Sequence, residues 1–127
     1  MKTLEEFGRV YEELGDALVK HVSLSFSTGN LPDIVVVLHC YSTVRNGDFV
    51  YLKLTFTEVQ EFRVDSSDYR YSLTVIYGFA ANQFEDLFVF DFAPMRLGPE
   101  TMVQHRESMF YIACKNFNYE EIEWPEG

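Results

Sequence analysis

Hydrophobic residues recur at three- and four-residue steps near the start of the chain, a spacing that places them on one face of an α-helix. These positions are Leu4, Phe7, Tyr11, Leu14 and Leu18. Thr3 and Glu6 have the spacing of a capping box, in which each side chain satisfies a free backbone N–H of the other residue. The pattern predicts an amphipathic helix from about Leu4 to Lys20.

From Val22 onward the period changes to two, which is typical of strands with one buried face. Valine, leucine and phenylalanine alternate with serine over residues 22–27. Residues 34–41 instead form a nearly continuous apolar run, which favours a central strand covered on both faces. Asn46-Gly47 has the composition of a type I′ turn, and residues 50–56 then alternate again. The pattern therefore predicts a strand followed by a β-hairpin.

The second half of the chain continues to alternate. It predicts further strands over residues 60–64, 69–77, 87–92 and 109–117, with turns over residues 65–68 and 82–86. Between residues 95 and 108 the alternation stops, and Pro99 before Glu100 suits the start of a short helix. The acidic tail, residues 119–127, is expected either to form an edge strand or to stay partly free.

One domain over residues 1–127 is the expected organisation, because this length is close to the commonest domain size. The predicted fold class is α+β and mainly β. The N-terminal amphipathic helix would pack on an antiparallel sheet or sandwich of about seven strands. Twelve Phe and eight Tyr agree with this, since aromatic side chains suit half-buried pleated surfaces. The strand order does not follow from one sequence.

Charge narrows the range of partners. Twenty acidic and ten basic residues give a formal net charge of −10, and such a surface repels phosphate groups. Direct binding to nucleic acid or to an anionic membrane is therefore not expected, and a basic protein partner is the natural complement. Many soluble proteins are acidic simply because charge keeps them dispersed, so charge alone does not identify a function.

The expected location follows from the apolar runs and the cysteines. The first residues are acidic where a signal peptide would be apolar, and no apolar run approaches the roughly 20 residues that span a bilayer. Cys40 and Cys114 each lie in an apolar segment. We therefore expect a cytoplasmic protein with two buried free thiols, with a disulfide or a reactive cysteine pair as the alternatives.

Catalytic and cofactor motifs are absent from the sequence. None of the three histidines has the spacing of a zinc site, and there is no Gly-rich phosphate loop or nucleophile motif. We expect no metal and no cofactor, and a binding protein is favoured over an enzyme. Asp91, between Phe90 and Phe92, is the most unusual polar position. If it is buried, its carboxyl group must be paired or protonated; a solvated strand end is the alternative.

The favoured functional hypothesis is a non-catalytic, acidic interaction protein that binds a basic partner, such as an inhibitor of a basic enzyme. Bacterial immunity proteins, which neutralise toxin nucleases, are an analogy in size and charge. The predicted contact surface combines rigid aromatic anchors with charge, although the tyrosines could equally form cross-strand ladders within the sheet. Its residues are Tyr69, Arg70, Tyr71, Glu120, Glu121, Glu123 and Trp124.

The alternative hypothesis is a small-molecule-binding protein or minor enzyme, with a pocket between the helix and a curved sheet. The residues expected to line its wall are Phe84, Phe88, Phe90 and Phe92, with His39 or Asp91 as the polar contact. A homo-oligomer that pairs through an exposed edge strand is a third hypothesis. An open cavity of several hundred Å³ would favour the pocket, and a filled core with a flat acidic face would favour the interaction protein.

Overall fold

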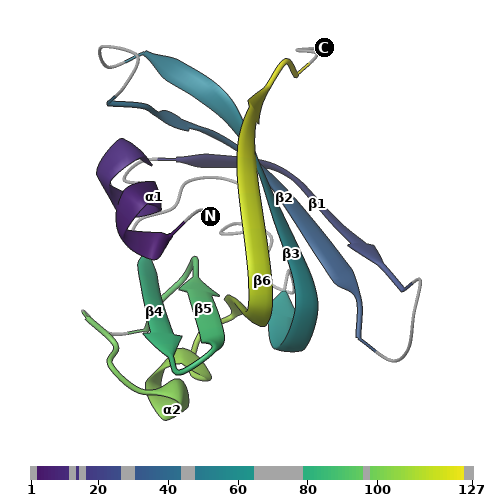
Figure 1. Cartoon of the computed structure of the whole chain (residues 1–127), viewed down its shortest axis with the longest axis vertical. Helices are drawn as coiled ribbons and strands as arrows, with labels where there is room; N and C mark the ends of the chain where they lie inside the picture. Colours follow the sequence, from purple (N-terminus) through teal and green to yellow (C-terminus); the bar gives the residue numbers. More distant parts are fainter. Residues whose placement is uncertain are drawn as a thin grey trace.

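The computed structural model describes residues 3–11, 14, 17–26, 31–43, 48–64, 79–95 and 98–124. These residues form one antiparallel sheet of six strands with two short helices, so the fold is mainly β, as predicted (Figure 1). In chain order the elements are α1 (Leu4–Tyr11), β1 (Leu18–Ser25), β2 (Asp33–Tyr41), β3 (Phe49–Val64), β4 (Ala80–Phe84), β5 (Leu87–Asp91), α2 (Met102–His105) and β6 (Phe110–Ile122). The strands lie side by side in the order β1-β2-β3-β6-β5-β4.

The predicted hairpin is formed by β2 and β3. These strands pair antiparallel from Tyr41 opposite Phe49 to Ile34 opposite Phe56; the predicted turn residues, 46–47, lie outside the described residues. The alternation predicted for residues 50–56 is confirmed, because the even-numbered side chains are buried in the core and the odd-numbered side chains are half-buried on the other face.

The structure describes six strands where about seven were predicted, partly because residues 49–64 form one strand instead of two. Glu58 has a left-handed φ of 51°, and the pairing with β6 shifts register between Val59 and Glu61. This β-bulge bends β3 without ending it, so the predicted strand over residues 60–64 is the second half of β3. Of the two predicted arrangements, an antiparallel sheet or a sandwich, the described residues form the single sheet. The strand predicted over residues 69–77 lies outside the described residues.

The first helix is much shorter than predicted. It ends at Tyr11 instead of near residue 20. Leu14 then has a φ of 62°, a left-handed conformation that an α-helix cannot contain. Leu18, which the apolar spacing assigned to the helix, is the first residue of β1. Leu14 is nevertheless fully buried, so the spacing identified an apolar core position but not its backbone conformation.

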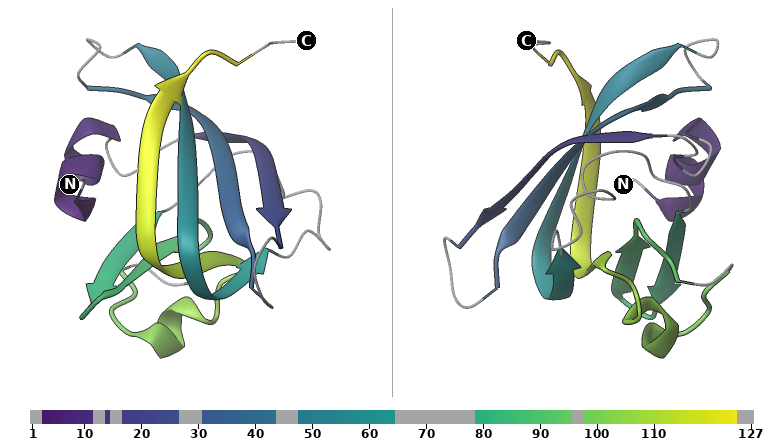
Figure 2. Two further views of the ribbon diagram at one scale, coloured as in Figure 1. Left: turned by 45° about the vertical axis from the view of Figure 1, so that its right-hand side comes forward. Right: turned by 180° about the vertical axis from the view of Figure 1, so that it is seen from behind.

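The sheet curves so that its last strands, β5 and β4, lie on the same side of β1, β2 and β3 as α1 (Figure 2). The start of α1 is capped by Thr3, whose Oγ1 accepts a hydrogen bond from the backbone N–H of Glu6 at 3.1 Å. Phe7 is buried, and the centroid of its ring lies 5.2 Å from that of Tyr119 and 5.9 Å from that of Phe90. These contacts join α1 to β6 and β5 through the main hydrophobic core.

α2 covers the opposite face of β5. Met102 packs against a small second core that contains Val89 and Tyr111. The helix begins slightly later than predicted, after Thr101, whose side chain forms a complete capping box with Gln104. Both faces of β5 are therefore covered, one by the main core and one by α2. Neither described helix is long and apolar enough to cross a membrane.

An ion pair ties the end of α2 to β3. Arg106 donates hydrogen bonds from Nε and Nη2 to the carboxylate of Glu61, each at 2.9 Å, and the hydroxyl of Tyr111 donates to the same carboxylate at 2.7 Å. The hydrogen bonds from Arg106 lower the pKa of Glu61. Burial, and then the bond to Glu61, raises the pKa of Tyr111 to about 12. These contacts hold α2 against the sheet.

Candidate functional site

A buried polar pair joins the end of β5 to the end of α2. Asp91 and His105, the last residues of these elements, are both fully buried. His105 Nδ1 lies 2.8 Å from Asp91 Oδ2, and Asp91 Oδ1 accepts a hydrogen bond from the backbone N–H of Ala93 at 3.1 Å. Asp91 is thus buried and paired. It does not lie at a solvated strand end, because α2 covers the face of β5 that carries it.

Asn82 of β4 forms a hydrogen bond with His105 and thereby determines which ring nitrogen of His105 carries the hydrogen. Asn82 Nδ2 lies 2.8 Å from the carbonyl oxygen of Pro99 and 2.8 Å from His105 Nε2. A carbonyl oxygen only accepts hydrogen bonds, so the amide nitrogen must face Pro99, and its second hydrogen points to His105. Nε2 is then the acceptor, and Nδ1 carries the hydrogen donated to Asp91. The hydrogen bonds run in one direction, from Asn82 to His105 to Asp91.

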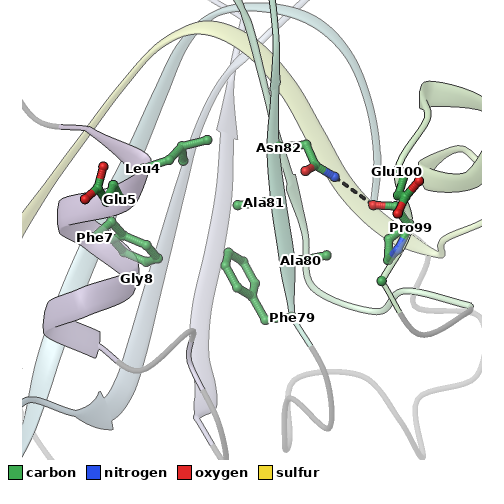
Figure 3. Close-up of a pocket in the computed structure, with 11 residues that line it drawn as sticks. Leu4, Glu5, Phe7, Gly8, Phe79, Ala80, Ala81, Asn82, Pro99 and Glu100 are labelled. Atoms are coloured by element: carbon green, nitrogen blue, oxygen red, sulfur yellow. Dashed lines mark hydrogen bonds between the residues drawn. The ribbon is translucent and has the colours of Figure 1, made fainter.

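Asn82 also lines a cleft between α1 and β4 (Figure 3). The cleft has a volume of about 480 Å³, which falls within the range of about 300–1,000 Å³ that is usual for small-ligand sites. Its lining consists of Leu4, Glu5, Phe7, Gly8, Phe79, Ala80, Ala81, Asn82, Gly98, Pro99 and Glu100. We call it the α1–β4 cleft. Glu5 lies on the helix side and Glu100 on the opposite side.

The buried chain can orient a group but is poorly suited to base catalysis. In a Ser–His–Asp triad the imidazole Nε2 takes a proton from a nucleophile. Here Nε2 of His105 accepts a hydrogen bond from the Asn82 amide, which is not a nucleophile, and the ring is fully buried. The hydrogen bonds among Asp91, His105 and Asn82 therefore hold the Asn82 amide in one orientation at the surface of the cleft.

The two cysteines are not activated. Cys40 and Cys114 are free and fully buried, so the prediction of buried thiols is confirmed for the folded chain. Burial raises the pKa of both thiols to about 12, and the charge of Glu121 adds to the shift of Cys40. A nucleophilic cysteine must be a thiolate, and these thiols remain protonated near neutral pH. Within the described ranges, His, Cys, Asp and Glu side chains do not gather in a group of three that could hold a metal ion.

A second depression lies where β3 begins and β6 ends, and we call it the aromatic groove. It measures about 520 Å³ and is lined by Phe49, Val50, Tyr51, Glu121, Ile122, Glu123 and Trp124. Beside it, the ring of Tyr51 stacks on that of His39 with 4.4 Å between centroids, and the Trp124 ring lies 5.7 Å from that of His21. Because β2 and β3 separate β1 from β6, the contact with His21 requires the chain after β6 to run across the sheet face.

Four of the predicted contact residues lie at this groove or beside it. Glu121, Glu123 and Trp124 line it, and Glu120 is exposed on the neighbouring part of β6. Part of the tail is therefore a strand, because β6 extends to Ile122. Glu121 has a second role, since it accepts a hydrogen bond from the Tyr11 hydroxyl at 3.2 Å. Burial and the charge of Glu121 raise the pKa of Tyr11, and this contact links β6 to α1.

The polar candidates of the pocket hypothesis are far apart in the sheet. His39 is half-buried on β2, where it stacks on a tyrosine, whereas Asp91 is buried at the end of β5. Neither residue lines the α1–β4 cleft. Phe90 and Phe92, expected in the pocket wall, are packed in the main core. Residues 69–71, predicted as part of the interaction surface, lie outside the described residues.

The sequence reasoning missed Asn82 and His105. Asn82 was placed in a turn over residues 82–86, but β4 continues to Phe84 and the turn consists of Glu85 and Asp86. His105 lacks any metal-ligand spacing and therefore gave no motif. Two features of the sequence could have pointed to His105. A buried Asp91 needs a hydrogen-bond partner, and the short helix that follows could bring a histidine to it.

Comparisons of the chain with protein-family models, with curated proteins and with solved structures give no match. Two regions of the described chain have the features of a binding site: the aromatic groove, and the α1–β4 cleft with its buried hydrogen-bonded residues.

Proposed function

We propose that this protein is a non-catalytic binding protein that recognises a basic protein partner through the aromatic groove. The observation that carries this proposal is a large exposed aromatic side chain beside carboxylates. Phe49 is 53% exposed at the rim of a groove that also contains Glu123 and Trp124. Singly exposed apolar residues are common on folded proteins, but Phe49 belongs to a contiguous lining with Tyr51, Ile122 and Trp124, and such a group favours a contact surface.

Aromatic anchors supply most of the binding energy at protein interfaces. Tyrosine and tryptophan are enriched among the residues whose truncation weakens binding most, because they bury a large area with few rotatable bonds. Tyr51 and Trp124 line the groove, and each already contacts a neighbouring ring of the sheet. These contacts restrain the side chains before binding, which lowers the entropy lost when a partner docks.

Charge complements the aromatic anchors. Among the described residues, the groove lining contains Glu121 and Glu123 and no basic side chain. The whole chain carries a formal charge of −10. Complementary charge accelerates diffusional encounter, and the effect weakens as salt screens it. A basic partner is therefore favoured over an acidic or neutral one.

An inhibitor of a basic enzyme is the kind of interaction protein that we favour, by analogy with bacterial immunity proteins in size and charge. The buried thiols of Cys40 and Cys114 suit a reducing compartment such as the cytoplasm. The acidic groove would bind over the active site of the partner enzyme. Its carboxylates would then lie where a polyanionic substrate normally binds.

The test is affinity capture from native lysate at low and at moderate salt, with the wild-type chain, Glu123→Lys and Trp124→Ala as baits. We expect one basic protein to be retained at low salt and partly lost at higher salt. Glu123→Lys should slow its association, because it reverses a charge in the groove, and Trp124→Ala should speed its dissociation. Association and dissociation rates of the purified partner are then measured by biolayer interferometry.

Glu85→Lys is the matched control, because it makes the same charge change at an exposed residue of the β4–β5 turn, away from the groove. The proposal requires Glu123→Lys to slow association several-fold more than Glu85→Lys does. Equal effects of the two substitutions would reduce the interaction to net charge and contradict the groove. Retention of the same chain alone, or of no protein, would also contradict a basic partner.

A second candidate function is the binding of a small ligand. The cleft volume of about 480 Å³ favours it, although the cleft uses the α1–β4 junction instead of the phenylalanine wall expected from the sequence. The chemistry of its lining identifies the class of ligand.

A further inference from the structure

The α1–β4 cleft contains a polar group that can only accept hydrogen bonds. Both amide hydrogens of Asn82 are engaged, one by the carbonyl oxygen of Pro99 and one by Nε2 of His105. Its remaining polar atom is the amide oxygen. Asn82 projects from β4 on the side of Pro99 and Glu100, where the cleft continues around the edge strand (Figure 3). An occupant that bonds to Asn82 must therefore be a donor.

Two carboxylates also favour a ligand that donates hydrogen bonds in this cleft. Glu5 on α1 and Glu100 before α2 line opposite sides of it, and the described lining residues include no basic side chain. Among these residues, Asn82, Glu5 and Glu100 thus present acceptors without a competing cation. An anionic ligand would meet acceptors and negative charge, whereas a cation would gain both hydrogen bonds and charge pairing.

The remainder of the cleft is suited to a hydrocarbon chain. Leu4 and Phe79 border the space between α1 and β4, and the small side chain of Ala81 leaves it open, whereas Ala80 lies on the Pro99 side of the strand (Figure 3). Aliphatic groups gain free energy when they leave water for such a surface. An aromatic ring such as that of Phe79 also attracts a nearby organic cation.

We propose that the α1–β4 cleft binds an organic cation, a primary ammonium or guanidinium group on a short aliphatic stem. The cation donates a hydrogen bond to Asn82 Oδ1, Glu5 and Glu100 balance its charge, and the stem packs against the apolar lining. Asn82 is the contact residue, whereas His105 and Asp91 are positioning residues that hold its amide. The proposal stands independently of the partner at the aromatic groove.

The test is a titration of the ¹⁵N-labelled protein with agmatine and with putrescine, followed by NMR. The side-chain amide signals of Asn82 report on the site directly. We expect saturable shifts of these signals and of the backbone amides of residues 79–82. Pentanamide and pentanoate, which have similar stems but a neutral or an anionic head, should produce no saturable shift.

Substitutions of exposed residues separate the cleft from general attraction to an acidic protein. Glu5→Gln combined with Glu100→Gln should weaken agmatine binding about tenfold or more, because it removes two charged acceptors. Glu85→Gln and Asp86→Gln together make the same change of charge on the β4–β5 turn, outside the cleft. This control should alter affinity less than about twofold, since an exposed charge away from the site contributes little.

Nα-acetyl-arginine amide distinguishes the two sources of such a cation. Binding of this compound with an affinity close to that of agmatine would show that the cleft accepts an arginine side chain of a polypeptide. Binding of agmatine or putrescine alone would show that it accepts a free amine, and either result supports the proposal. Absence of saturable shifts with all three cations, or equal weakening by the cleft and turn substitutions, would overturn it. A failure to capture a basic protein at the groove leaves this titration unaffected.

Discussion

Replacing His105 with leucine tests the buried polar chain most directly. The substitution keeps an apolar side chain of similar size but removes the hydrogen bond to Asp91 Oδ2. The carboxylate, which is fully buried, then keeps only the N–H of Ala93 as a hydrogen-bond partner. Solvent cannot replace the lost bond without opening the contact between α2 and β5.

The expected loss of stability is large for a domain of this size. Removing one partner of a buried hydrogen bond leaves the other polar group unsatisfied, which costs about 1–3 kcal/mol. Small domains are stable by only about 5–15 kcal/mol in total. The Asn82 amide also loses an acceptor, but Asn82 lines the cleft, where water can replace it, so we assign it no additional cost. We therefore expect His105→Leu to lower the free energy of unfolding by about 1–3 kcal/mol.

The measurement is urea unfolding at pH 7, followed by far-UV circular dichroism. With a urea dependence of about 1–3 kcal/mol per molar, the midpoint should fall by roughly 1 M. The control is Asp91→Leu combined with His105→Leu, which removes the carboxyl group along with its partner. Replacing both members of a buried hydrogen-bonded pair with apolar residues is often close to neutral, so the double variant should be more stable than His105→Leu alone. A loss below about 0.5 kcal/mol for His105→Leu, or a double variant that is the less stable of the two, would refute this reasoning.

Two further predictions concern groups whose pKa is raised by burial. Because the pKa of Cys40 and Cys114 is about 12 in the folded protein, Ellman's reagent at pH 8 should label both at least about a hundredfold more slowly than in the urea-unfolded chain; rapid labelling of the native protein would contradict their burial. The raised pKa of Tyr111, about 12 against an ordinary 10, means that the unfolded chain loses this proton first, so its contribution to stability is complete below about pH 10 and is lost as the pH rises toward 12. Tyr111→Phe should therefore make the free energy of unfolding fall less steeply above about pH 10 in urea titrations, and an unchanged slope would count against this explanation.

The alternation of apolar and polar residues predicted strands correctly where neighbouring residues alone determine the pattern. Side chains of a strand point alternately to its two faces, and residues 50–56 follow this alternation in β3. The rule could not show that the strand continues past Glu58, because the bulge depends on pairing with β6, more than fifty residues later in the chain. Two segments that look separate in the sequence are therefore one bent strand.

The length of α1 shows a different limit of the sequence. Leu14 and Leu18 continue the helical spacing of Phe7 and Tyr11, yet they lie beyond the helix. Periodicity records which positions are apolar, and Leu14 is indeed buried. It does not record the left-handed conformation of Leu14, because tertiary packing overrides a modest helix propensity.

The candidate site was predictable only in part, because its polar chain is assembled from three separate elements. The flanking phenylalanines made Asp91 conspicuous, and the rule that a buried carboxyl group needs a partner was sound. The partner itself, His105, is fourteen residues away on a helix of four residues. Asn82 comes from β4, which the sequence analysis assigned to a turn. No local motif connects these three residues.

The buried chain is better explained by the cleft than by stability. An apolar pair in place of Asp91 and His105 would be about as stable, so stability alone gives little reason for a polar pair at this position. An apolar pair could not hold the Asn82 amide with both hydrogens engaged and only its oxygen left for a ligand. The variant that replaces both residues with leucine separates the two roles. If the hydrogen bonds of Asp91 and His105 hold Asn82 for ligand binding, this variant remains folded but binds agmatine more weakly. If Asp91 and His105 only fill the space under α2, the affinity of the variant for agmatine is unchanged.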